Sequence, residues 1–295
     1  MVSAPDPVVD RFARFEVLPL GRSEQEAAQL PEPARLTVTC SPKHGPDRSV
    51  EIARRLRAHG HEVTVHLAAR MVRDHDHLDR LLTEMVDTGV DDVFVIGGDS
   101  PRPHGRYRSA VQILPEISAH PHRPHTIGIG VYPEGHPHID DVTLADALEH
   151  KCPYADYMTS QLCFHADALL SWAEETRARG VTLPLIVGVP GVVDHRKLLE
   201  MSMRIGVGSS LSFLRKQRGF VRNLLGPSRH AADHLFDDLV PALADGRLGV
   251  TGFHYYTFNK LVDTWRWDRE KRGGWTPAAD RRAAGEEAAA AKAAL

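Results

Sequence analysis

Residues 48–99 read RSVEIARRLRAHGHEVTVHLAARMVRDHDHLDRLLTEMVDTGVDDVFVIGGD and contain the same pattern twice. Each copy is an amphipathic helical segment, then a glycine, then a short run of apolar and β-branched residues. The glycines, Gly60 and Gly89, suit the left-handed conformation in which many helices end. The runs at 62–67 and 92–96 are rich in apolar and β-branched residues, which is typical of parallel strands buried on both faces. The stretch therefore predicts two helix–strand units of a parallel α/β fold.

The same alternation continues over most of the chain. Eight runs are expected as strands: Phe15–Leu18, Leu36–Cys40, Glu62–Leu67, Asp92–Ile96, Thr126–Val131, Ala155–Ser160, Leu185–Val189 and Gly252–Tyr256. Helices are expected between them, including Arg48–Ala58, Leu78–Asp87 and Asp167–Ala178, the last followed by Gly180. A doubly wound open sheet is the alternative, but eight strands favour a closed barrel. We therefore predict a single-domain (βα)8 TIM barrel of the α/β class.

Two regions depart from the regular alternation. Residues 190–251, between the seventh and eighth runs, are more than one helix needs, so two or three helices are expected there. Residues 273–295 are rich in alanine, which predicts a peripheral helix or a disordered tail. The predicted organisation is therefore a barrel over residues 1–272 and a tail over 273–295.

The bulk composition narrows the class of protein. The 295 residues are 42% hydrophobic and 25% charged, with a formal net charge of −3, which gives no reason to expect nucleic acid or an acidic membrane as a partner. No apolar run approaches the roughly 20 residues of a membrane span, and the N-terminal residues lack the apolar core of a signal peptide. The three cysteines, odd in number and widely spaced, fit a reducing compartment. We therefore expect a cytoplasmic protein.

Polar residues collect at the ends of the predicted strands. They are Glu16, Thr39, His66, Asp99, Tyr132 and Gln161, and the eighth run continues into Thr257-Phe258-Asn259. In a parallel barrel the carboxyl ends of the strands share one rim, and that rim carries the active site. Glu16 lies inside an apolar run, where burial of a charged carboxylate is costly and the pKa should rise. Glu16 is therefore a candidate general acid.

Each of these residues also has a purely structural interpretation. Glu16, near the start of its strand, could point to solvent. Asp99 could cap the next helix after a tight Gly97-Gly98 turn. Residues 132–137, YPEGHP, could form a rigid proline-rich loop, and Gln161 could be a hydrogen-bonded core amide.

Seven motifs along the chain keep both order and spacing with those of one enzyme family. They are Phe15-Glu16 with Pro19, Thr37-Val38-Thr39, His66-Leu67, Ile96–Asp99, Tyr132–Pro137, Ala155-Asp156 with Ser160–Leu162, and His254–Lys260. Through them the chain resembles the methylenetetrahydrofolate reductases from about Phe15 to Lys260. The segments YPEGHP and HYYTFN are the most specific.

This resemblance implies an oxidoreductase of folate one-carbon metabolism, on the route to methionine, with a (βα)8 fold. The implied reaction reduces 5,10-methylenetetrahydrofolate to 5-methyltetrahydrofolate with NADH or NADPH. Glu16 would be the general acid, Asp99 and Gln161 would bind the pterin, and Phe258 would contact the substrate. Lys260 stands where the family has arginine and would face the glutamate tail of the folate. Family members are often oligomeric, which makes a homo-oligomer compatible with the resemblance.

The departures from the family cluster around its flavin. Gly97 replaces the arginine of the family's L-R-G-D motif, and His150 aligns with a flavin-binding lysine. Because charge-assisted contacts to phosphate are lost, the chain looks more like the flavin-free reductases of some actinobacteria, which take hydride directly from a nicotinamide. Thr39, His66, Tyr132 and His136 would then contact the nicotinamide nucleotide. An FAD-dependent reductase is the alternative.

Two further classes are weighed against this function. A non-catalytic folate-binding barrel would keep the architecture, although retention of Glu16 with Asp99 and Gln161 argues against it. A metal hydrolase is suggested by the 18 histidines, but His120, His122 and His125 share one proline-rich loop and no H-E-x-x-H motif occurs. We therefore predict no metal site. A dinucleotide fingerprint is not supported either, because Gly128-Ile129-Gly130 lies inside a predicted strand and lacks the third glycine.

Overall fold

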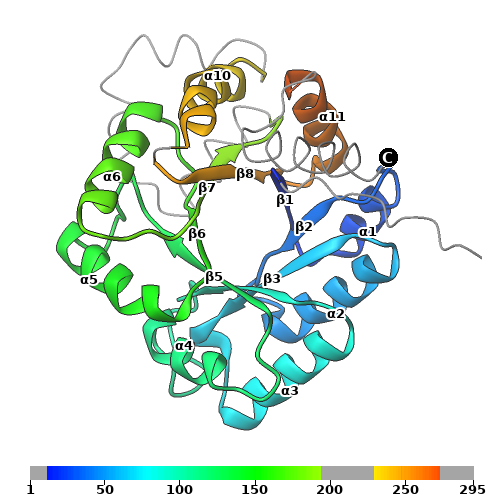
Figure 1. Cartoon of the computed structure of the whole chain (residues 1–295). Coiled ribbons are helices and arrows are strands. Elements are labelled where there is room, and N and C mark those ends of the chain that lie inside the picture. The colour runs from blue at the N-terminus through cyan, green and yellow to red at the C-terminus, as the bar shows by residue number, and fades with distance from the viewer. Residues whose placement is uncertain (1–11, 194–228, 247, 273–295) are drawn as a thin grey trace, which may run out of the picture.

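The computed structural model describes residues 12–193, 229–246 and 248–272, and its centre is a closed barrel of eight parallel strands (Figure 1). The strands follow one another around the barrel in sequence order. Their bounds are β1 Ala13–Val17, β2 Arg35–Val38, β3 Glu62–Ala68, β4 Asp92–Ile96, β5 Thr126–Val131, β6 Tyr157–Ser160, β7 Leu185–Pro190 and β8 Val250–Tyr256. The predicted (βα)8 fold is confirmed.

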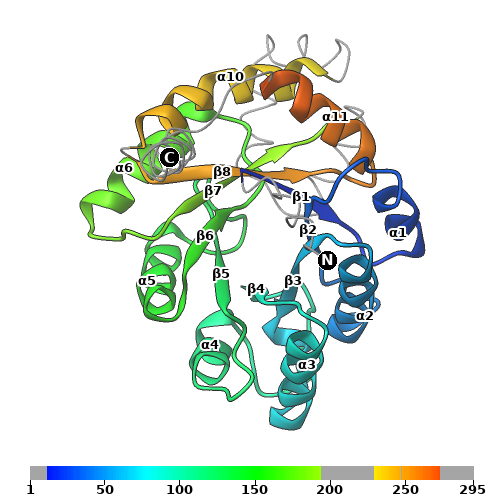
Figure 2. The same cartoon turned by 45° about the vertical axis from the view of Figure 1, so that its right-hand side comes forward.

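Helices surround the ring of strands (Figures 1 and 2). The described α-helices are α1 Gly21–Ala27, α2 Gly45–Ala58, α3 His75–Asp87, α4 Ala110–Ser118, α5 Asp141–Lys151, α6 Ala166–Ala178, α10 Arg229–Asp245 and α11 Leu261–Arg272. Two short 3₁₀ turns, η1 Ala69–Met71 and η2 Cys152–Tyr154, follow β3 and α5. α10 and α11 lie side by side over β7, β8 and β1, held by the bond that the Trp267 indole donates to Asp233.

Most strand bounds agree with the prediction to within two residues, and the differences have local causes. β2 ends at Val38 because the Thr39 carbonyl accepts the hydroxyl of Ser49 from α2. Residue 156 precedes β6, since the Asp156 carboxylate accepts the backbone N–H of Ile127. The predicted helix ends are also confirmed, because Gly60, Gly89 and Gly180 all have φ between 73° and 88°.

One helix of the region between the last two strands lies among the described residues. That helix is α10, whereas residues 194–228 lie outside the described residues, as do residues 1–11 and the tail 273–295. No helix in the described ranges is long and apolar enough to cross a membrane.

The strand register decides which side chains point into the barrel. Glu16 pairs with Thr37, and Thr37 pairs with Thr64, so these three share one face of the sheet. That face is the interior, because it also carries Phe94, which packs with Tyr157 inside the ring. Side chains alternate along a strand, so every second residue beyond these also faces inward.

Candidate active site

Glu16 and two histidines form a buried cluster inside the barrel. Glu16 lies on β1, His66 on β3 and His254 on β8, and the Nε2 of His254 is 3.5 Å from Oε2 of Glu16. The Glu16 side chain is 11% exposed, so it does not point into open solvent. The two imidazole rings lie nearly parallel with centroids 6.3 Å apart. The carboxyl group of Glu16 thus lies close to the imidazole nitrogens of His66 and His254.

Burial controls the charge of all three groups. It raises the pKa of Glu16 to about 7, and a smaller attraction from His66 acts in the opposite direction. Burial lowers the pKa of His66 to about 4 and that of His254 to about 3. Both histidines are therefore neutral near pH 7, so neither forces Glu16 to ionise. A carboxyl group in this setting can carry a proton at neutral pH and release it on demand.

Three buried polar atoms beside Glu16 have no hydrogen-bond partner among the described residues. They are Oγ1 of Thr37, Oγ1 of Thr39 and Nε2 of His66. All three residues lie on the inward face of β2 and β3 or directly follow it. Since an unpaired buried polar atom is costly, these atoms indicate a place where a ligand supplies the missing partners.

The loop after β4 brings Asp99 to the rim. Gly98 has φ of +87°, and a Cβ there would lie 2.7 Å from Cβ of Ala68, so only glycine fits this turn. Arg70 fixes the loop by donating to the carbonyls of Ser100 and Pro101, at 2.7 and 3.0 Å. Asp99 itself is exposed, and α4 has Ser109 as its N-cap, so the interpretation of Asp99 as a helix cap is wrong.

The loop after β5 lies beside Asp99. Tyr132 and His136 meet edge to face with ring centroids 5.1 Å apart. Burial raises the pKa of Tyr132 and lowers that of His136, and in both cases the Asp99 charge is a smaller influence. Gln161, half-buried after β6, accepts the N–H of Leu162 through Oε1 at 2.8 Å. The rim therefore brings the sequence-predicted residues of β4, β5 and β6 into one neighbourhood.

Glu134 joins the loop after β5 to the loop after β6. Its Oε1 accepts the backbone N–H groups of Phe164 and His165 at 2.6 and 2.8 Å, and lies 3.3 Å from Nδ1 of His165. These contacts place a carboxylate at the start of α6, where the helix dipole favours negative charge. Glu134 was not predicted as a site residue, although it is part of the YPEGHP motif.

Replacing Glu134 by alanine is expected to lower the free energy of unfolding by about 1–3 kcal/mol, because two partly buried N–H groups lose their acceptor. Denaturant unfolding of the variant measures this loss. Glu149→Ala is the control, since Glu149 pairs with Arg179 in a solvent-exposed ion pair and should have little effect. Equal stability of the two variants would contradict a clamping role for Glu134.

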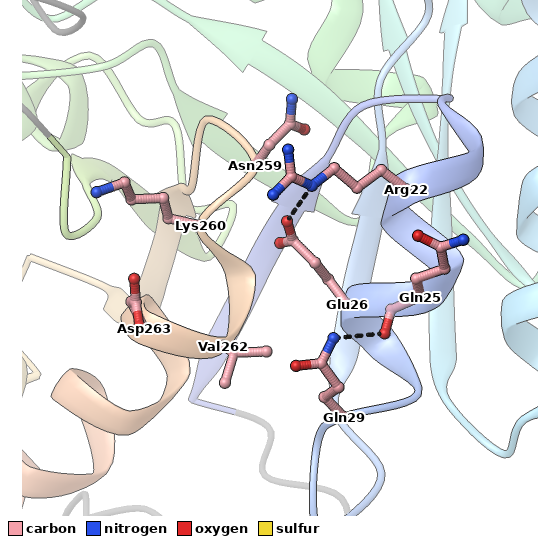
Figure 3. Close-up of a pocket in the computed structure, with 8 residues that line it drawn as sticks. All are labelled: Arg22, Gln25, Glu26, Gln29, Asn259, Lys260, Val262 and Asp263. Carbon is pink, nitrogen blue, oxygen red and sulfur yellow. Dashed lines mark hydrogen bonds and ion pairs between the residues drawn. The ribbon is translucent and has the colours of Figure 1, made fainter.

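The rim continues at the end of β8. Phe258 and Asn259 have φ of 49° and 65°, and the turn they form places Lys260 immediately before α11. The phenylalanine packs on Leu162, close to Gln161 in the chain. Figure 3 shows a polar pocket between α1 and the start of α11, where the Arg22 side chain reaches from α1 toward Asn259 and Lys260 lies to one side. The volume of the pocket is about 520 Å³.

His150 stands where the resembled family has a flavin-binding lysine, and its surroundings differ from those of the next residue, Lys151. His150 is exposed on α5, where its ring Nδ1 contacts the carbonyl of Asp146 at 2.8 Å. The next residue, Lys151, is buried and donates to the carbonyl of Gly130 at 2.6 Å. Burial lowers the pKa of Lys151 to about 8. Nothing in the sequence favours Lys151 over His150, because the two are consecutive residues in the last turn of α5.

Two groups of described residues hold metal-ligand atoms within 4.8 Å of one another. One is the Glu16 cluster, and the other is Asp79 with His120 and His122. In the second group Nδ1 of His120 accepts the N–H of His122 at 3.1 Å, so the proton of a neutral ring is on Nε2, which faces Asp79 at 3.3 Å. Both ring nitrogens of His120 are therefore engaged, one by the N–H of His122 and the other by Asp79. His120 has no lone pair free for a metal.

The chain matches the model of one enzyme family over most of its length. The family model described as methylenetetrahydrofolate reductase matches residues 26–264. The chain belongs to this family. The match begins after Glu16, so the role of that residue depends on the Phe15-Glu16 motif and on the geometry of its cluster.

Curated relatives are distant. Methylenetetrahydrofolate reductase 1 of Schizosaccharomyces pombe is 21% identical over 62% of this chain and 31% of its own length. Methylenetetrahydrofolate reductase 2 of Saccharomyces cerevisiae is 23% identical over 62% of this chain and 32% of its own length. A probable NADH-type reductase of Oryza sativa is 24% identical over 43% of this chain and 24% of its own length. The matches thus cover about a third or less of these relatives.

Among solved structures, a Clostridium thermocellum protein described as binding two copies of 5-methyl-5,6,7,8-tetrahydrofolic acid has a similar fold. Its TM-score is 0.58 at 12% identity, over 87% of this chain and 95% of that one. At this identity the likeness supports the fold alone.

Proposed function

We propose that this protein reduces 5,10-methylenetetrahydrofolate to 5-methyltetrahydrofolate with a nicotinamide nucleotide, and that Glu16 is the general acid. Family membership supports the substrate class. The observation that carries the proposal is the Glu16 carboxyl, buried between two neutral histidines, with a pKa raised to about 7.

The reaction needs a proton and a hydride in sequence. Glu16 protonates N10 of the imidazolidine ring, the bond between N10 and the bridging carbon breaks, and an iminium forms at N5. A bound nicotinamide supplies the hydride that reduces the one-carbon unit. The protein's contribution is to deliver the proton and to hold the two reactants in register.

Residues of the rim orient the folate in this proposal. Asp99 and Gln161 present a carboxylate and an amide to the amino, N–H and carbonyl edge of the pterin. Phe258 offers an aromatic ring on the same side, and Lys260 lies at the exit where an anionic glutamate tail leaves the barrel. Lysine makes a less directional contact than arginine at such a site.

The nicotinamide is assigned to His66 of β3 and to residues that follow β2 and β5. The unpaired atoms of Thr39 and His66 fit a ligand with both donors and acceptors, such as a carboxamide. Tyr132 and His136 offer an aromatic surface after β5, beside Asp99. The flavin fits less well, because Gly97 supplies no cation and His150 is exposed and already contacts a carbonyl.

The deciding experiment mixes purified protein with NADH or NADPH and methylenetetrahydrofolate, without flavin, in the presence and in the absence of EDTA. Oxidation of the nicotinamide and formation of 5-methyltetrahydrofolate are expected. Activity only after FAD is added would favour the flavin-dependent reductase. Activity lost to EDTA would indicate a metal at the Glu16 cluster, and folate binding without turnover would indicate a binding protein.

The rate of turnover is expected to fall as the pH rises through about 7, because the acid form of Glu16 disappears. Above that midpoint kcat should drop about tenfold per pH unit. Steady-state kinetics at saturating substrates between about pH 6 and pH 9 measure the profile. A flat profile across this range would contradict proton donation by Glu16.

A further inference from the structure

The His254 side chain is held in one position inside the barrel, next to Glu16. It lies on β8 in register with Gly188 of β7 and Arg14 of β1, and only 2% of it is exposed. Its ring meets Tyr256 nearly perpendicularly at 5.0 Å. A side chain that is enclosed in this way inside the barrel cannot turn its ring away from Glu16.

The groups that face this pair come from several strands. They are Arg14 of β1, His66 of β3 and Tyr256 of β8. Burial, with a smaller repulsion from Arg14, keeps the His254 imidazole neutral. A neutral imidazole has one N–H, and Nε2 is the nitrogen that faces the carboxyl oxygen.

We propose that His254 is a positioning residue: its Nε2–H donates to Oε2 of Glu16, so that Oε1 is the oxygen that carries and delivers the proton. The inference depends on the proposed reduction. The contact of 3.5 Å is at the outer limit of a hydrogen bond, as is common before substrate binds, and it shortens when proton transfer leaves a full charge on Glu16. The donor thereby stabilises a carboxylate that would otherwise be buried without a partner.

Two substitutions separate this role from simple packing. His254→Gln places an amide N–H near the position of Nε2, whereas His254→Phe keeps the ring shape and removes the donor. We expect the glutamine variant to keep kcat within about threefold and the same pH midpoint. The phenylalanine variant should lose about tenfold to a hundredfold in kcat with little change in KM. Its midpoint should move to higher pH by about one unit, since the Glu16 carboxylate loses a donor.

The control is His61→Phe, because His61 is also a buried histidine but bonds the backbone N–H of Ala34 away from Glu16. It should change neither kcat nor the midpoint. A wild-type rate and midpoint in His254→Phe would overturn the proposal, and so would equal losses in the glutamine and phenylalanine variants.

A measurement on the unaltered protein tests the same idea without turnover. In ¹⁵N-histidine NMR spectra, His254 should be neutral with its proton on Nε2, and His254→Gln serves to assign the signal. A proton on Nδ1 would overturn the proposal even if His254→Phe failed to fold. Because this readout does not need activity, failure of the reductase assay and failure of the His254 inference are distinguishable.

Discussion

Glu16→Gln is expected to lower kcat by about 10²–10⁴, the usual contribution of a general acid, while the barrel remains folded. Glutamine has nearly the same volume and can still meet His254, but it has no proton to deliver at neutral pH. KM for the folate should change little, since the pterin is assigned to Asp99 and Gln161. Steady-state assays of wild type and variant at one pH measure the ratio. A near-wild-type rate would show that the proton comes from another group.

The stability of the Glu16→Gln variant gives an independent check on the raised pKa. The folded-state pKa of Glu16 lies above its ordinary value of 4.5, so the stability it contributes is fully present below pH 4.5 and is lost as the pH rises through about 7. The variant lacks this dependence. The free energy of unfolding of the variant minus that of the wild type should therefore rise by about 3 kcal/mol between about pH 4 and about pH 8. A constant difference would mean that the carboxyl is not buried in solution.

Much of the barrel follows from local sequence. Apolar runs such as Asp92–Ile96 and Thr126–Val131 are short, rich in β-branched residues and bounded by helices, so their bounds are predicted without error. Glu16 and His66 could also be predicted, because each interrupts such a run. In a strand the side chains alternate, and a polar residue in an apolar strand inside a barrel has few places to point.

The partners of these residues could not be found in the same way. His254 lies 238 residues from Glu16, and only closure of β8 onto β1 brings them together. Within the motif His254–Lys260 nothing distinguished the first histidine from a core residue. Lys151 was missed for a related reason, since a lysine at a helix end normally reaches solvent, whereas this one finds the carbonyl of Gly130.

The floor of the barrel is a polar network that sequence reasoning also missed. Asp92 of β4 accepts the Arg14 guanidinium at 2.9 Å and the Thr64 hydroxyl at 2.8 Å through Oδ2, and the Tyr157 hydroxyl at 2.9 Å through Oδ1. Arg14 also lies over the Tyr157 ring, 4.2 Å from its centroid. Four strands thus meet at one carboxylate, directly below the cluster of Glu16 and His254.

Asp92→Ala is expected to lower the free energy of unfolding by about 3–5 kcal/mol, because it leaves a buried arginine charge without its partner. The side chains of Arg14 and Asp92 are only 7% and 13% exposed, so solvent cannot replace the lost carboxylate. Glu62→Ala is the matched control, since the Glu62 side chain pairs with Arg35 but is 38% exposed and its loss should cost about 1 kcal/mol or less. Denaturant unfolding of both variants measures the difference. If Asp92→Ala were no less stable than Glu62→Ala, the buried network would not hold the strands together, and Arg14 would have to find another partner inside the barrel.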